Sequence, residues 1–155
     1  MTYAQNGSNY NYTIHLTNTG TVTLDAFWFA WVPDINFMPT AAFNIGAPAG
    51  WTGTSTNNGS LGDGYGIEWL TSSSPLGTGS SADFTFTSAT TPTQMAAPSQ
   101  AYPFYNTTLS YVYQGQPYPG FSPFSTLTVQ VVPEPATMAS LVAGGLLVLR
   151  RRRKA

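Results

Sequence analysis

The sequence up to Val132 consists mostly of short runs in which apolar and polar side chains alternate. Tyr10, Tyr12, Ile14 and Leu16 alternate with polar residues, and this period of two is typical of a β-strand with one buried face. Clusters of Gly, Pro, Ser and Asn separate the runs, and helical periodicity of useful length is absent from this part. These features predict one all-β domain, an antiparallel sandwich of about seven strands. The further strands are expected at 22–32, near Trp51, and at 65–70, 82–87, 109–113 and 127–132.

The end of the chain differs in composition from the rest. The tripeptide Pro133-Glu134-Pro135 is followed by an apolar run at 136–149 and then by a basic cluster. The cluster consists of Arg150, Arg151, Arg152, Arg153 and Lys154, and these are the only five Lys and Arg residues in the chain. We therefore expect two units, a β-sandwich over 1–132 and a tail over 133–155.

The apolar run is expected to form a short transmembrane helix. Its 14 residues would span about 21 Å as an α-helix, which is short against the roughly 30 Å of a bilayer core. Snorkelling of the arginines and local thinning of the bilayer can cover part of this mismatch. The basic cluster should stay on the cytoplasmic side, so the sandwich should lie outside the cytoplasm as an ectodomain. A marginal span of this kind suits a transient membrane anchor.

Val132-Pro-Glu-Pro-Ala-Thr, the glycine-leucine segment at 144–147 and the arginines at 150–153 occur in this order at the end of the chain. This arrangement resembles the PEP-CTERM sorting signal of Gram-negative bacteria, which often make exopolysaccharide. The resemblance implies recognition by an exosortase, a membrane cysteine transpeptidase thought to cut near the tripeptide. Pro133, Glu134 and Pro135 would then be recognised as substrate. The competing interpretation is a plain tail anchor.

The resemblance also implies a location and a set of partners. The protein would be held transiently in the inner membrane, processed by the exosortase and then found at the cell surface or in the extracellular matrix, with exopolysaccharide as a further partner. Proteins with this signal normally begin with a secretory signal peptide, whereas residues 1–8 contain neither a basic nor an apolar stretch. We therefore expect the true start to lie upstream, and the alternative is a truncated gene product.

Three segments of the sandwich, at 16–20, 76–80 and 84–88, carry a Leu-Thr-Asn-Thr-Gly, a Leu-Gly-Thr-Gly-Ser and a Phe-Thr-Phe-Thr-Ser sequence. These segments resemble the loose framework of bacterial immunoglobulin-like adhesin modules. The resemblance implies an immunoglobulin-like sandwich with a structural or adhesive role.

Residues 1–132 offer little catalytic chemistry, and we expect neither an enzyme nor a cofactor. His15, the single histidine, falls on the polar face of its strand, and no G-x-S-x-G motif presents a serine nucleophile. Asp63 and Glu68 could be drawn as a glycosidase pair or a Ca²⁺ site, but an Asx turn with one exposed strand residue also explains them. Since no cation is available before position 150 to neutralise phosphate, we expect no nucleic-acid partner.

Aromatic residues make up 14% of the chain, and they support an alternative function as a carbohydrate-binding module, because aromatic faces stack on sugar rings. Alternation over 22–32 separates Trp28, expected in the core with Phe84, from its neighbours on the opposite face. If that opposite face is open, it would be a contiguous apolar binding surface. The competing interpretation is that the aromatic side chains fill the core. The candidate ligand-contact aromatics are Phe27, Phe29, Trp31, Trp51 and Trp69.

Overall fold

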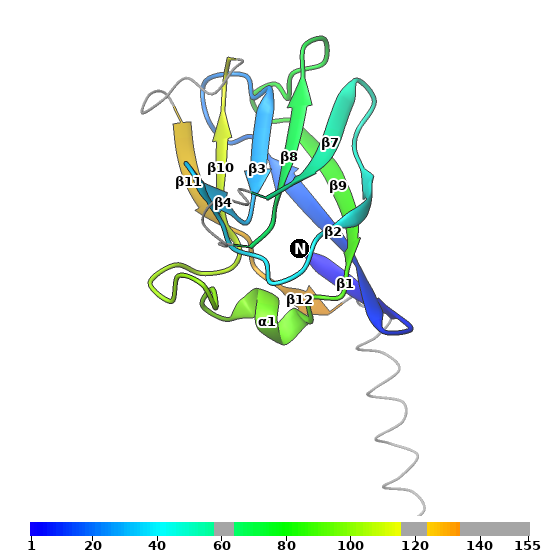
Figure 1. Cartoon of the computed structure of the whole chain (residues 1–155). Coiled ribbons are helices and arrows are strands. Elements are labelled where there is room, and N and C mark those ends of the chain that lie inside the picture. Colours follow the sequence, from blue (N-terminus) through cyan, green and yellow to red (C-terminus); the bar gives the residue numbers. More distant parts are fainter. Residues whose placement is uncertain (58–63, 116–123, 134–155) are drawn as a thin grey trace, which may run out of the picture.

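The computed structural model describes residues 1–57, 64–115 and 124–133, and this part of the chain is all-β, as predicted (Figure 1). One short helix interrupts the strands. In chain order the elements are β1 (Thr2–Asn6), β2 (Asn9–Thr17), β3 (Ala26–Phe29), β4 (Trp31–Val32), β5 (Ile35–Asn36), β6 (Phe43–Gly46), β7 (Trp51–Thr56), β8 (Gly66–Thr71), β9 (Ser81–Ser88), α1 (Pro92–Ala96), β10 (Leu109–Tyr113), β11 (Phe124–Thr128) and β12 (Val132–Pro133).

Two five-stranded sheets face each other (Figure 1). The first has the strand order β12-β1-β2-β9-β6, and the second has the order β11-β10-β3-β8-β7. Neighbouring strands run antiparallel, except that β1 and β12 run parallel. The strands β4 and β5 form a separate two-stranded hairpin. The chain therefore changes sheet repeatedly. It leaves the first sheet after β2, returns for β6, returns again for β9 after β7 and β8, and ends in the first sheet at β12.

Aromatic side chains fill the space between the sheets. Phe84 of β9 lies 5.2 Å, centroid to centroid, from both Phe27 of β3 and Trp69 of β8. Phe86 of β9 lies 5.4 Å from Phe29 in the same way. All five are at most 1% exposed, and burial of a side chain of this size stabilises a fold by about 1.5–3 kcal/mol. This cluster joins the two sheets, and the prediction that Phe84 lies in the core is confirmed.

The strand boundaries differ from the expected ones where the chain turns. The run expected over 22–32 is divided into β3 and β4, because Ala30 between them adopts a left-handed backbone conformation with a φ of 56°. The run expected over 127–132 is likewise divided, between β11 and β12. The strands β1 and β6 and the hairpin partner β5 were not predicted, because their short segments carry little alternation.

The helix α1 also lies where no helix was predicted. The hydroxyl oxygen of Thr91 accepts a hydrogen bond of 3.2 Å from the backbone N–H of Gln94, and the Gln94 side-chain oxygen accepts one of 2.8 Å from the Thr91 N–H. This reciprocal capping box and Pro92 in the first turn start the helix, and the buried Met95 holds it on the core. A helix of five residues is too short to show a helical period.

The expected transmembrane helix at 136–149 lies outside the described residues, as do Glu134, Pro135 and the basic cluster 150–154. In the part that the structure describes, no helix has the length and apolar character needed to cross a bilayer.

Candidate functional site

Trp31 lies outside the core because the chain turns at Ala30. In β3 the alternation is regular, so Phe27 and Phe29 point into the core and Trp28 points away from it. Ala30 then takes its left-handed conformation, and its carbonyl oxygen accepts a hydrogen bond of 2.9 Å from the Phe37 N–H. The turn interrupts the alternation, and Trp31 consequently stacks on Trp28 rather than joining the core cluster.

The indoles of Trp28 and Trp31 are stacked, with ring centroids 4.2 Å apart and an interplanar angle of 27°. The Trp28 Nε1 donates a hydrogen bond of 2.8 Å to the Tyr113 hydroxyl. Tyr111 meets Trp31 edge to face, with the centroids 5.7 Å apart. These contacts fix the orientation of both indoles, of which Trp28 is partly exposed and Trp31 is 8% exposed.

The two indoles line one side of a small pocket with a volume of about 260 Å³. Its other lining residues are polar: Asp34, Asn36, Thr56 and Asn57. Asp34 is exposed in the turn between β4 and β5, where its φ is 68°. The Thr56 hydroxyl donates a hydrogen bond of 2.9 Å to Asn36 Oδ1, and the Asn57 side-chain amide donates one of 2.7 Å to the Gly64 carbonyl oxygen. The pocket thus combines aromatic surface with hydroxyl, amide and carboxylate groups.

Glu68 adds a second carboxyl group near the pocket, on the face of the second sheet that carries Trp28. It lies opposite Trp28 on the neighbouring strand β8 and is partly buried, and this burial raises the pKa of its carboxyl above the ordinary 4.5. Since residues 1–132 contain no Lys or Arg, neither Glu68 nor Asp34 has a lysine or arginine from this part of the chain to offset its charge.

Most of the expected ligand-contact aromatics lie in the core. Phe27, Phe29 and Trp69 are each 0% exposed, so the expectation that they line an open face is wrong. Trp51 is 9% exposed and packs edge to face on the core ring of Phe84. Of the expected set, only Trp31 lines the pocket.

Sequence reasoning missed Trp28 and the polar lining of the pocket. Period-two alternation shows that Trp28 and Phe27 face opposite ways, but it cannot say which face is covered by the second sheet. Trp28 was assigned to the core and is instead partly exposed. Asn36 and Thr56 come together across two strands that are distant in sequence, and no local pattern signals such a contact.

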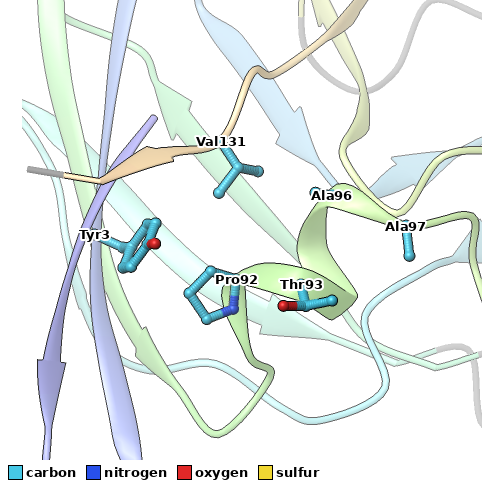
Figure 2. A pocket seen from close by; sticks show the side chains of 6 residues that line it. All are labelled: Tyr3, Pro92, Thr93, Ala96, Ala97 and Val131. Carbon is cyan, nitrogen blue, oxygen red and sulfur yellow. The ribbon is translucent and has the colours of Figure 1, made fainter.

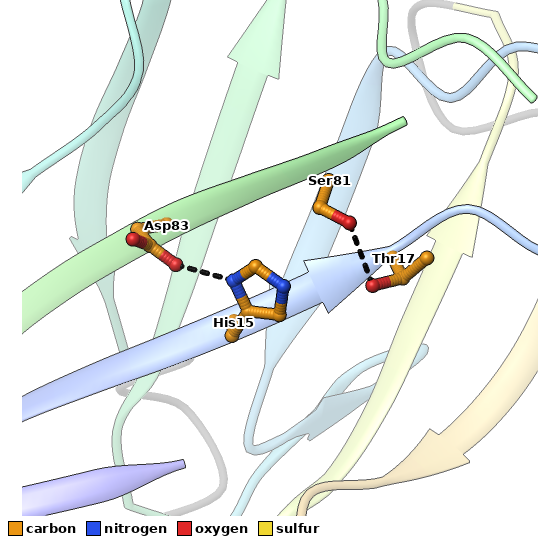
Figure 3. Close-up of polar contacts among 4 residues, drawn as sticks. All are labelled: His15, Thr17, Ser81 and Asp83. Atoms are coloured by element: carbon orange, nitrogen blue, oxygen red, sulfur yellow. Dashed lines mark hydrogen bonds and ion pairs between the residues drawn. The ribbon is translucent and has the colours of Figure 1, made fainter. Parts of the chain in front are cut away.

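His15 lies on the outer face of the first sheet, as its alternation predicts (Figure 3). Its Nδ1 is 2.7 Å from Asp83 Oδ1, and beside this pair the hydroxyls of Thr17 and Ser81 are 2.8 Å apart. The side chains of His15 and Asp83 are 65% and 62% exposed. Among the described residues, the His15 ring makes no hydrogen bond to a hydroxyl nucleophile, so the arrangement is a solvated pair on a strand surface.

Of the expected Ca²⁺ candidates Asp63 and Glu68, Asp63 lies outside the described residues, so this site stays a prediction. Over the described ranges, no group of three or more His, Asp or Glu side chains is arranged to hold a metal ion.

A shallow apolar groove of about 450 Å³ lies between α1 and the edge of the first sheet (Figure 2). Its lining residues are Tyr3, Pro92, Thr93, Ala96, Ala97 and Val131. Val131 directly precedes β12, so the groove adjoins the point where the described chain ends.

Pro133, the first residue of the expected sorting tripeptide, belongs to β12, which is an edge strand of the first sheet. β12 pairs in parallel with β1, with Thr2 opposite Val132 and Tyr3 opposite Pro133. The backbone N–H of Val132 donates a hydrogen bond of 2.9 Å to the Met1 carbonyl oxygen. The expected boundary between residues 132 and 133 therefore falls within a strand, and the tripeptide begins at a sheet edge.

Comparison with known proteins identifies the end of the chain. The sequence model of the family described as PEP-CTERM protein-sorting motif matches residues 131–154. The chain therefore carries a PEP-CTERM protein-sorting motif, which confirms the resemblance seen in the tripeptide, the apolar run and the basic cluster. Neither the curated proteins nor the solved structures include a match to the chain.

Proposed function

We propose that this chain is an exported surface protein whose C-terminal segment is recognised and removed by an exosortase. The match of residues 131–154 to the PEP-CTERM protein-sorting motif carries this proposal. The motif supports an exported, membrane-associated protein that an exosortase sorts. The proposal adds transient anchoring in the inner membrane by 136–149, cleavage near Pro133, Glu134 and Pro135, and a final position at the cell surface or in the extracellular matrix.

The position of the motif supports the proposal as well. Pro133 is held at the edge of the first sheet by the pairing of β12 with β1. Removal of the residues that follow Pro135 would therefore leave every strand described above intact. The ectodomain can therefore stay folded after the tail has been removed.

The intact mass of the protein recovered from its native host tests the cleavage. The wild-type chain should lack the segment that follows the tripeptide, whereas a chain with Pro133, Glu134 and Pro135 replaced by alanine should keep it. Pro103→Ala, an exposed proline outside the motif, is the matched control and should be processed normally. A wild-type chain that still contains 150–155 would contradict the proposal and favour a plain tail anchor.

For the ectodomain we propose a structural or adhesive role without catalysis. The support is that His15 and Asp83 form a solvent-exposed pair. The expected immunoglobulin-like topology is part of this proposal, and its support is that strands distant in sequence are neighbours, with β2 beside β9 in one sheet and β3 beside β10 in the other. Purified ectodomain should release no product from polysaccharide, ester or peptide substrates. Turnover that is lost on His15→Ala would contradict this role.

A second candidate function is carbohydrate binding, and the pocket beside Trp28 and Trp31 favours it. Ligand pockets are commonly concave and lined by aromatic side chains with a few polar groups. This pocket has both kinds of lining. Exopolysaccharide would be the natural partner of such a protein outside the cell. Retention of the ectodomain on immobilised polysaccharide, compared with an uncoated matrix, tests this function as a whole.

A further inference from the structure

We infer that the pocket lined by Trp28 and Trp31 binds an uncharged glycan, with a sugar ring against the Trp28 indole and its hydroxyls on the polar lining. This inference rests on the carbohydrate-binding candidate and adds the binding residues and the class of ligand. The pocket differs from the surface expected from sequence, because Phe27, Phe29 and Trp69 are fully buried.

The aromatic side of the pocket is held in place before any ligand arrives. Trp31 stacks on Trp28 at 4.2 Å between centroids, and the Tyr113 hydroxyl accepts the hydrogen bond from Trp28 Nε1. An indole that is already ordered loses little rotamer freedom on binding, so less of the contact energy is spent on ordering. Its partly exposed surface offers the flat apolar area on which the C–H face of a sugar ring packs.

The polar side of the pocket offers both donors and acceptors. Asp34 and Asn57 are exposed and Thr56 is partly exposed, so a ligand in the pocket can reach hydrogen-bonding side chains. A carboxylate accepts, an amide does both, and a hydroxyl does both. Sugar hydroxyls can exchange hydrogen bonds with this mixture, whereas a purely apolar ligand would take these polar groups out of water and return no hydrogen bonds.

The negative charge of the carboxyl groups at and near the pocket selects against acidic glycans. Asp34 lines the pocket, Glu68 neighbours Trp28, and residues 1–132 contain no Lys or Arg to pair with a carboxylate or sulfate. Like charges brought together at an interface disfavour binding. The volume of about 260 Å³ lies just below the roughly 300–1,000 Å³ of drug-sized sites. The occupant is therefore a short segment of an uncharged chain.

The test is binding of the folded protein to two sets of soluble oligosaccharides, one uncharged (gluco-, manno- and xylo-oligosaccharides) and one acidic (oligouronates), measured by calorimetry. We expect at least one uncharged oligosaccharide to bind, and its affinity to fall about tenfold or more in Trp28→Ala. Phe104→Ala is the matched control, because Phe104 is 97% exposed and lies outside the pocket. This control should bind as the wild type does.

A second variant guards against misfolding of Trp28→Ala. Asn57 is exposed, so Asn57→Ala should keep the fold, shown by an unchanged near-ultraviolet circular dichroism spectrum, and should weaken binding severalfold.

The outcomes separate the inference from the function on which it rests. Binding of uncharged oligosaccharides that survives both Trp28→Ala and Asn57→Ala would overturn the assignment of the site and leave carbohydrate binding standing. Binding of oligouronates as tight as that of uncharged chains would overturn the ligand class. Failure of the wild type to bind either set would overturn the inference, and failure also on immobilised polysaccharide would overturn the carbohydrate-binding candidate itself.

Discussion

The indole Nε1 of Trp69 donates a hydrogen bond of 3.0 Å to the backbone carbonyl oxygen of Gly46, and this bond joins β8 of the second sheet to β6 of the first. Gly53 of β7 lies against the same indole. A Cβ added at Gly53 would lie 2.6 Å from Trp69 Nε1, closer than atoms of a relaxed structure approach. The absence of a side chain at Gly53 is therefore required for the bond between the sheets.

Gly53→Ala should lower the free energy of unfolding by about 1–3 kcal/mol, because the methyl group displaces Trp69 in a close-packed core. Urea denaturation followed by tryptophan fluorescence measures the change. Gly77→Ala is the control, since the nearest atom to its added Cβ is at an ordinary 3.6 Å, and it should change stability by less than about 0.5 kcal/mol. Equal stability of the two variants would contradict the proposed packing at Gly53.

Tyr12 should make the fold sensitive to alkali. Its hydroxyl is buried and donates a hydrogen bond of 2.6 Å to the Thr90 carbonyl oxygen. Burial, and to a lesser extent the nearby Tyr10 and Tyr3, raise its pKa well above the ordinary 10.0. Because the folded state holds this proton more tightly than the unfolded chain, the stabilisation is complete below about pH 10 and is lost as the pH rises further.

Tyr12→Phe separates this effect from general alkaline unfolding. Removing the hydroxyl leaves the Thr90 carbonyl without this partner and should cost about 1–3 kcal/mol near pH 7. The difference from the wild type should shrink above pH 10, where the wild type loses the contribution of Tyr12. Denaturation midpoints between pH 7 and 11 measure this, and a constant difference over that range would speak against the buried hydroxyl as the cause.

Glu68→Gln should stabilise the folded ectodomain at neutral pH. Burial raises the pKa of the Glu68 carboxyl above 4.5, so its contribution to stability is complete below that pH and falls as the group ionises at higher pH. The gain should stay below about 1 kcal/mol, because solvent still reaches the side chain. Melting temperatures at pH 4 and pH 7 should show the gain only at pH 7. Asp83→Asn, which removes the exposed partner of His15, should give no such gain.

Val132→Pro should detach β12 without unfolding the core. Proline lacks the N–H that Val132 donates to the Met1 carbonyl oxygen at 2.9 Å. Hydrogen exchange should accelerate in β1 and stay unchanged in β9. Val132→Thr keeps the backbone N–H and should exchange like the wild type. Slow exchange in β1 of the proline variant would show that β1 does not depend on β12.

Long alternating runs were predictable from the sequence, whereas turns between them were not. β2 has nine residues, and its pattern identified both the strand and the polar placement of His15. The positive φ of Ala30 carries no sequence signal, since alanine rarely adopts this conformation. The sequence grouped Trp31 with Phe27 and Phe29, because a continuous strand would have placed all three on one face. The turn at Ala30 separates Trp31 from them.

The sorting motif was easier to predict from the sequence than the pocket, for a related reason. The sorting motif is contiguous in sequence, so its tripeptide, apolar run and basic cluster could be identified without a structure. The pocket takes its lining from the end of β3, the β4–β5 hairpin and the end of β7. These segments meet through the pairing of β3 with β8 and of β8 with β7 and through the hydrogen bond from Thr56 to Asn36, and no local pattern specifies these contacts.

The pairing of β12 with β1 also sets how a mechanical load would enter the molecule. A pull on the tail of an anchored chain reaches the sandwich through β12, whose ladder with β1 spans two residue pairs. The ladder between β2 and β9 spans eight residue pairs. Under tension β12 would peel away first and lengthen the tether by a few residues, while the aromatic core between the sheets stays assembled.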